Sequence, residues 1–200
     1  RGYMLAAGLE GGKVIDDDLR SFLVLSAQAQ AYVPLGSSRV TLGLRLRGAS
    51  NVGERPLPLP LRVFGGGASG HRGFGRRELS PGLFVAEADV GPDGDDDDAG
   101  YFPVGGESLV LATAEVRFDL FQLFDRWGGL VVFTDVGDVA LSPRGLDVSQ
   151  PHVASGLGLR VGTPVGAIRF DLGYRLNRLG AGEPAPNDRW VPHLGIGEAF

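Results

Sequence analysis

Residues 166–178 read GAIRFDLGYRLNR, a stretch in which apolar and polar residues alternate along its length. Successive side chains of a β-strand point to opposite faces of the sheet, so one face of this strand is apolar and the other carries charged residues or glycine. The apolar positions are Ile168, Phe170, Leu172, Tyr174 and Leu176. Residues 39–47, which read RVTLGLRLR, repeat the pattern. The alternation predicts an antiparallel sheet with one apolar face.

The length of the alternating segments separates a soluble sandwich from a membrane-spanning barrel. The segments run for roughly ten to fifteen residues, whereas soluble strands average about five or six and a tilted membrane-spanning strand needs about nine to eleven. Arginine and glycine on the polar face suit a water-filled interior, and a sheet in lipid must close because open edges are not tolerated there. We predict an all-β fold, a transmembrane antiparallel β-barrel, with strands at about 1–10, 19–33, 38–48, 106–119, 128–139, 153–163, 166–178 and 189–200.

The connections between the predicted strands alternate between short and long. The short ones are 34–37, 121–127 and 164–165, and the long ones are 11–18, 49–105, 140–152 and 179–188. Outer-membrane barrels have short periplasmic turns and longer external loops, whereas a soluble sandwich has no reason to sort its loops by side. The spacing therefore predicts a bacterial outer-membrane location, with the chain end at Phe200 on the periplasmic side.

The composition and the first residues of the chain limit which classes of protein are possible. The formal net charge of −5 argues against a nucleic-acid partner. The absence of cysteine excludes a disulfide framework and a thiolate metal site. The sequence contains no run of eighteen apolar residues, so no transmembrane helix is predicted. The chain starts with Arg1 and has no signal peptide, so we expect the N-terminal part of the barrel to be missing. An eight-stranded barrel complete in itself is the alternative, but its interior is just filled by side chains and has no room for a long loop.

The connection at 49–105 is too long to be a passive link, since loops of this length are usually functional or disordered. Its middle, residues 65–74, reads GGGASGHRGF. One interpretation is a flexible glycine tract. The other is a tight turn that inserts Arg72 into the barrel toward carboxylates. Glu115 and Asp135 are lone acids in apolar runs and should face the interior, because a charge facing lipid is costly; water in the interior is the alternative partner for both.

Four segments resemble motifs of the BamA/TamA family of outer-membrane assembly factors. Residues 70–74, GHRGF, resemble the family's V-R-G-F/Y loop tip, although His71 stands where the family usually has an aliphatic residue. FPVGG at 102–106 with AEVR at 114–117, and FTDVG at 133–137, resemble two of its strands. The longest match is residues 156–174, in which Ala167 replaces a common proline. Its signature positions are Gly158, Arg160, Thr163, Pro164, Gly166, Arg169, Asp171, Gly173 and Tyr174.

This resemblance implies a barrel of sixteen strands, of which residues 1–200 would form the last eight, preceded by the missing strands and by POTRA domains. The loop 49–105 would fold back into the lumen. There Arg72, with Gly73 and Phe74 beside it, would contact Glu115 and Asp135 and hold the loop in place.

The last predicted strand, residues 189–200, resembles the C-terminal β-signal of outer-membrane proteins. Trp190, Leu194, Ile196 and Phe200 share one face, and Pro192 cannot donate a ladder hydrogen bond, which suits a weak edge. The resemblance implies a lateral gate between the last and first strands, where an opened seam exposes backbone groups to which a client strand can add.

The sequence thus predicts an outer-membrane protein assembly, insertion or translocation factor that is not an enzyme. Its expected partners are the outer-membrane lipid bilayer, unfolded outer-membrane protein or autotransporter clients, and periplasmic or lipoprotein accessory subunits. A passive or substrate-specific pore, including a two-partner secretion transporter, is the alternative. An enzyme is another, because some relatives carry a lipase-like domain ahead of the barrel.

No cofactor or metal is expected. The acidic run 93–98 lacks the glycine and the final acid of an EF-hand loop. The three histidines show no ligand spacing, and Ser69 lacks the second glycine of a nucleophile elbow.

Overall fold

The computed structural model describes residues 2–14, 20–53, 56–85, 100–123, 125–164, 166–177 and 189–197. Its main feature is an eight-stranded antiparallel sheet in which each strand pairs with the next long strand in the chain. The order is β1 (Gly2–Val14), β2 (Arg20–Pro34), β3 (Val40–Asn51), β6 (Ser108–Leu123), β7 (Arg126–Ala140), β8 (His152–Thr163), β9 (Gly166–Arg175) and β10 (Trp190–Ile196). The prediction of an all-β fold with eight long antiparallel strands is confirmed.

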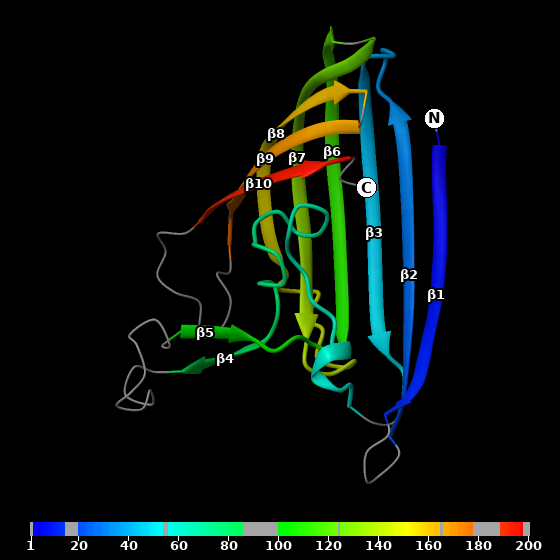
Figure 1. Ribbon diagram of the computed structural model, residues 1–200, viewed down its shortest axis with the longest axis vertical. Helices are drawn as coiled ribbons and strands as arrows, with labels where there is room; N and C mark the ends of the chain where they lie inside the picture. Colours follow the sequence, from blue (N-terminus) through cyan, green and yellow to red (C-terminus); the bar gives the residue numbers. More distant parts are fainter. Residues whose placement is uncertain are drawn as a thin grey trace.

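The segment between β3 and β6 contains further structure that the alternation did not predict. A short 3₁₀ helix, η1 (Leu59–Leu61), is followed by β4 (Gly82–Val85) and β5 (Gly100–Pro103), which pair with each other. In Figure 1 this hairpin lies beside the end of the sheet from which β3 leaves. The 3₁₀ turn and the hairpin are short, so a periodicity search has too few positions to detect them.

Two predicted connections differ from the structure. β1 continues to Val14 and β2 begins at Arg20, so residues 15–19 connect them and the link is no longer than residues 35–39 between β2 and β3. Gly11 and Gly12 fall in the predicted connection 11–18, but both pair with residues of β2 inside the ladder. The predicted turn 121–127 is mostly strand, because a register shift between Asp119 and Phe121 lets β6 pair onward to Leu123.

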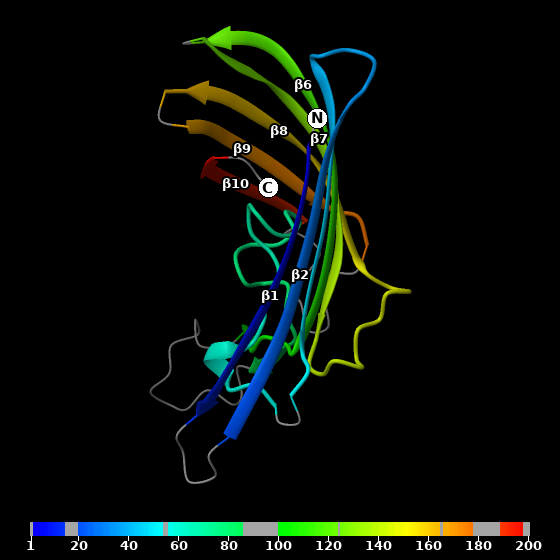
Figure 2. The same ribbon diagram turned by 90° about the vertical axis from the view of Figure 1, so that its right-hand side faces the viewer.

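The sheet is strongly curled, and the residues between β3 and β4 lie on its concave side (Figure 2). The ends where β2 meets β3, β6 meets β7 and β8 meets β9 lie together, whereas β3 and β7 end, and β6 and β8 begin, at the opposite end (Figure 1). This arrangement separates short turns from longer loops by side, as the sequence predicts, except at the short link 15–19.

The register brings the apolar positions of neighbouring strands onto one face. Phe170 of β9, for example, stands between Leu159 of β8 and Leu194 of β10. The large side chains exposed on this convex face include Tyr3, Leu5, Leu9, Leu25, Leu44, Leu46, Leu130, Val132, Leu157, Leu159, Ile168, Phe170, Leu194 and Ile196. Charged residues lie on the opposite face, and those near the loop, among them Arg45, Glu115, Asp135 and Asp171, are buried. The membrane-facing interpretation of the alternation therefore matches the register, because an outward apolar band is the surface that hydrocarbon requires.

A small core lies between the loop and the sheet. Phe74 and Leu79 of the loop pack with Leu109 and Leu111 of β6 and with Val139 of β7. Within the described part of the chain, no helix has the length and apolar character needed to cross a bilayer.

Candidate functional site

The loop that carries Arg72 is closed into a compact turn by glycines. Gly65 donates a backbone hydrogen bond to Leu79 at 2.8 Å, and Gly67 donates one to Phe74 at 2.8 Å. Gly66 and Gly67 both have φ of +88°, a region that favours glycine, and a Cβ on Gly66 would collide with the carbonyl of Gly75. The glycine tract is therefore an ordered turn that presents residues 71–73 to the concave face of the sheet.

Arg72 is bound by two carboxylates of the sheet. Its Nε lies 2.8 Å and its backbone nitrogen 2.9 Å from Oδ2 of Asp135 on β7, and a terminal nitrogen lies 3.0 Å from Oδ1 of the same residue. The other terminal nitrogen donates to Oε2 of Glu115 on β6 at 3.0 Å. All three residues are 1% exposed. The structure thus brings together the loop arginine and both acids that the sequence singles out.

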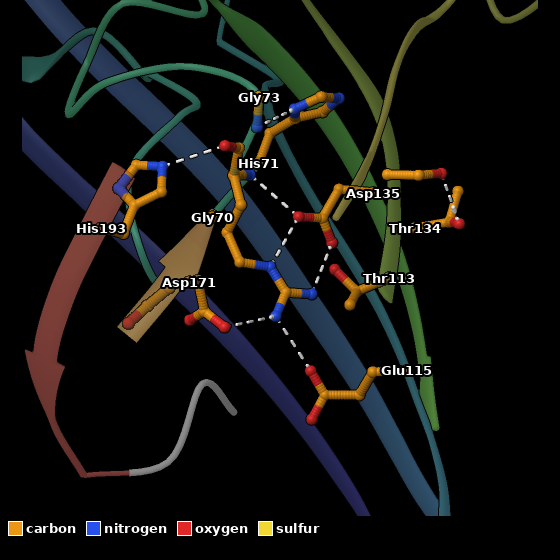
Figure 3. Close-up of polar contacts among 12 residues, drawn as sticks. Gly70, His71, Gly73, Thr113, Glu115, Thr134, Asp135, Asp171 and His193 are labelled. Carbon is orange, nitrogen blue, oxygen red and sulfur yellow. Dashed lines mark hydrogen bonds and ion pairs between the residues drawn. The ribbon is translucent and has the colours of Figure 1, made fainter. Parts of the chain in front are cut away.

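A third carboxylate and an aromatic ring complete the surroundings of Arg72. Oδ1 of Asp171 on β9 lies 3.9 Å from the guanidinium and 2.8 Å from a terminal nitrogen of Arg160 on β8. The guanidinium carbon lies 3.5 Å from the centre of the Phe133 ring, in cation–π geometry. Figure 3 shows Glu115, Asp135 and Asp171 turned toward one point beneath the loop.

Arg72 stays charged in this site. Burial alone would lower the pKa of its guanidinium, but the hydrogen bonds and charge of Asp135, together with Glu115 and Asp171, outweigh burial and raise that pKa. Removing one partner of a buried ion pair costs about 3–5 kcal/mol, because the other charge is left without compensation. Breaking the contact between the seated loop and the sheet therefore carries a large free-energy cost.

Side chains of the sheet also bind the backbone of the loop. Arg45 of β3 donates to the carbonyls of Ser69 at 2.8 Å and Gly70 at 3.2 Å. Arg169 of β9 donates to the Ser69 hydroxyl at 2.8 Å, and Arg175 of β9 donates to the carbonyl of Gly73. Arg45 and Arg175 were not among the predicted site residues. The only sign of their role in the sequence is that both occupy inward positions of alternating strands.

His71 fits its unusual position by making polar contacts. Its Nε2 donates to the carbonyl of His152 at 3.1 Å, and its Nδ1 accepts from the backbone N–H of Gly73 at 3.3 Å. These two roles fix the neutral tautomer with the proton on Nε2. Burial lowers the pKa of His71, and this outweighs the opposing effect of Asp135.

Phe74 anchors the other side of the loop tip. Its ring makes edge-on contacts with His71 and His152, with ring centres 5.2 Å apart in each case. The guanidinium carbon of Arg175 lies 4.2 Å from the ring centre of Phe74. Gly73, which precedes Phe74, packs so closely on Ala154 that an added Cβ would lie 2.5 Å from the Ala154 Cβ.

The predicted signature of residues 158–174 divides into three groups. Gly158, Arg160, Arg169, Asp171 and Gly173 lie at the loop site. At Gly173 an added Cβ would collide with the carbonyl of Arg72, and at Gly158 it would collide with the Asp171 carboxylate. The second group, Thr163, Pro164 and Gly166, lies where β8 meets β9, with the Thr163 hydroxyl donating to the Gly166 carbonyl at 2.6 Å.

Tyr174 forms the third group and lies on the opposite face from the loop. Its ring packs on Trp190 of β10, with ring centres 4.7 Å apart. Trp190, Pro192, Leu194 and Ile196 follow the same outward register, whereas Phe200 lies outside the described residues. The inward residue His193, which was expected only not to bind a metal, donates from Nε2 to the carbonyl of Arg72 at 3.0 Å.

The described residues contain no group of three or more histidine, cysteine or acidic side chains that could hold a metal ion. The acidic run 93–98 lies outside them.

Comparison with known proteins agrees with this architecture. The family model described as the Omp85 superfamily domain matches residues 1–200. The crystal structure of BamA from Haemophilus ducreyi lacking POTRA domains 1–3 is similar, with a TM-score of 0.66 at 17% sequence identity, over 98% of this chain and 38% of that one. The likeness at this identity concerns the fold, and the chain spans 38% of the length of that structure. No curated protein matches the chain. Because the family model covers the whole chain, the protein belongs to the Omp85 superfamily of the bacterial outer membrane.

Proposed function

We propose that residues 1–200 form the last eight strands of a sixteen-stranded barrel that inserts client proteins into the outer membrane or translocates them across it. In this proposal residues 49–105 are an external loop that folds back into the lumen. The observation that carries the proposal is the buried contact of Arg72 with Asp135 and Glu115. It fixes a loop against the concave face of the sheet, a contact that passive diffusion through a pore does not require.

The proposed mechanism uses the edge of the last strand. β10 has seven residues and includes Pro192, whose missing backbone N–H lies on the edge away from β9, so the free edge of β10 is short and pairs weakly. A gate between β10 and the first strand of the barrel would expose unpaired backbone groups when it opens. A client strand would then add there by β-augmentation, a step that needs neither a cofactor nor a catalytic group.

The proposed partners follow from this mechanism. The clients are unfolded outer-membrane proteins or autotransporters, whose strands can form backbone hydrogen bonds with the exposed edge of the gate. Accessory subunits and POTRA domains would lie outside residues 1–200.

Charge reversal at Arg72 in the complete protein tests the proposal. We expect Arg72→Glu to abolish folding of a denatured outer-membrane protein client in reconstituted vesicles, because a carboxylate cannot lie against Asp135 and Glu115. Arg76→Glu is the matched control, since Arg76 is an exposed residue of the same loop. Folding of each variant itself is checked by its heat-modifiable migration on gels.

Two outcomes would contradict the proposal. One is the absence of client assembly by the natural protein, whereas normal assembly by a folded Arg72→Glu variant would remove only the loop anchor from the mechanism. The other is a rise in ion conductance with no change in client handling, which would favour the pore.

A further inference from the structure

His193 connects the last strand to the loop tip. It lies on the inward side of β10 and is 9% exposed. Because a carbonyl can only accept, the imidazole Nε2–H is the donor in the 3.0 Å contact with the Arg72 carbonyl. Figure 3 shows His193 reaching the loop from the side opposite Asp135.

The position of the Arg72 carbonyl explains why this contact is specific to the last strand. The carbonyl lies directly over Gly173 of β9, where an added Cβ would collide with it. β10 is the neighbour of β9, with His193 opposite Asp171 and Val191 opposite Gly173. The acceptor therefore lies within reach of an inward side chain of β10 only while β10 stays paired with β9.

The other described side chains that hold the loop come from strands further from the edge or from β9. Asp135 lies on β7, Glu115 on β6 and Arg45 on β3. These contacts can hold the loop whatever β10 does. His193 is different, because its donor moves with β10 while its acceptor moves with the loop.

We propose that His193 is a positioning residue that couples the seating of the Arg72 loop to the pairing of the last strand. When β10 leaves β9, the buried Arg72 carbonyl loses its donor, and when the loop leaves, the buried imidazole loses its acceptor. Coupling of this kind is reciprocal, so each event favours the other by the same factor. This inference rests on the proposed function for its role: β10 is one side of the gate, and the His193 contact keeps it paired with β9 while its other edge opens toward the first strand.

The test is amide hydrogen exchange of the complete protein in lipid bilayers, followed in residues 69–74 and in residues 191–196. We expect His193→Phe, which keeps a ring but removes the N–H donor, to speed exchange in both segments by on the order of fivefold, the effect of losing one neutral hydrogen bond. His193→Gln retains an N–H donor and should restore most of the protection. A role in packing alone would be met by phenylalanine and not by glutamine.

Leu194→Ala is the matched control, because Leu194 is the next residue on β10 and faces outward. It should raise exchange in residues 191–196 while β10 stays mostly paired, so that the His193 hydrogen bond is kept and residues 69–74 are unchanged. In an Asp135→Asn background, which releases the loop, His193→Phe should have little further effect on β10.

The coupling is overturned if His193→Phe leaves the exchange of residues 69–74 unchanged, or if its effect on β10 is the same with the loop seated and released. These results differ from a failure of the proposed function. Coupled exchange in a natural protein that assembles no client would leave the coupling intact and remove the assembly role.

Discussion

At Arg72 the shape of the side chain matters as much as its charge. The guanidinium uses Nε and one terminal nitrogen on Asp135 and the other terminal nitrogen on Glu115, while its face lies on Phe133. A planar fork can satisfy two acids and a ring together, and an ammonium cannot. Gly156 opposite Phe133 leaves room for this ring, because a Cβ there would lie 2.5 Å from the ring edge.

The two acids should contribute unequally. Asp135 accepts three hydrogen bonds from Arg72, whereas Glu115 accepts one and is shared with Arg117. We expect Asp135→Asn to weaken loop seating by about 3–5 kcal/mol and Glu115→Gln by about 1.5–3 kcal/mol. Hydrogen exchange of residues 69–74 measures both. An equal or reversed order would mean that the network is not organised around Asp135.

Loop seating should weaken in acid because of His71. Its pKa is lowered from 6.5 when the loop is seated, so the released loop binds a proton that the seated loop does not. The seated state is therefore at full strength above about pH 6.5 and is disfavoured below it by at most about tenfold per pH unit. Protonation of Nδ1 would also remove the acceptor for the Gly73 N–H.

The measurement is protease cleavage within residues 65–79 between pH 7.5 and 5. Cleavage of the natural protein should rise as the pH falls. His71→Val, which does not titrate, supplies the baseline. Equal pH dependence in the two proteins would assign the effect to another group.

Arg72, Glu115 and Asp135 could be predicted from the sequence, but the roles of Arg45, Arg175 and His193 could not. A lone acid in an apolar strand is conspicuous, since only an inward orientation is tolerable. A cation at an inward position is ordinary, because many such positions face water. Whether it reaches the loop depends on the curl of the sheet and on the register, which no single strand encodes.

Close packing of the loop on the sheet requires glycine in the strands. Gly173 of β9 lies under the Arg72 carbonyl, so Gly173→Ala should force the loop away and cost about 1–3 kcal/mol of seating, as overpacking does elsewhere. Gly48 of β3 is the control, because an added Cβ would meet only the Leu109 carbonyl at 3.8 Å. Thermal unfolding and exchange of residues 69–74 should change in the first variant alone. Similar behaviour of the two variants would argue against a steric role for Gly173.

The strands themselves were predictable because period-two alternation is a local property. Their ends were less so, as the pairing of Gly11 and Gly12 inside β1 shows. A glycine pair is a turn signal in isolation. In a long ladder the hydrogen bonds of the neighbouring strand override that signal.

The whole molecule is organised by the difference between its faces. The convex face exposes leucine, isoleucine and aromatic side chains, and the concave face buries a network of arginine and carboxylate around the loop. A soluble sheet would cover its apolar side and expose its charges. Here the relation is inverted, which only an apolar solvent outside the sheet makes favourable.

A charge on the convex face tests that inversion. Leu157 lies within β8 between Val132 and Leu172 and is 63% exposed. In a bilayer Leu157→Arg should cost about 2–4 kcal/mol, the penalty for arginine near the midplane of a barrel, and should lower the yield of folded protein in vesicles. Leu141, which is 58% exposed just beyond the end of β7, provides the control, because Leu141→Arg lies past the strand and should cost about 0–1 kcal/mol. A leucine exposed to water would tolerate arginine at either position, so equal tolerance would contradict a lipid-facing convex surface.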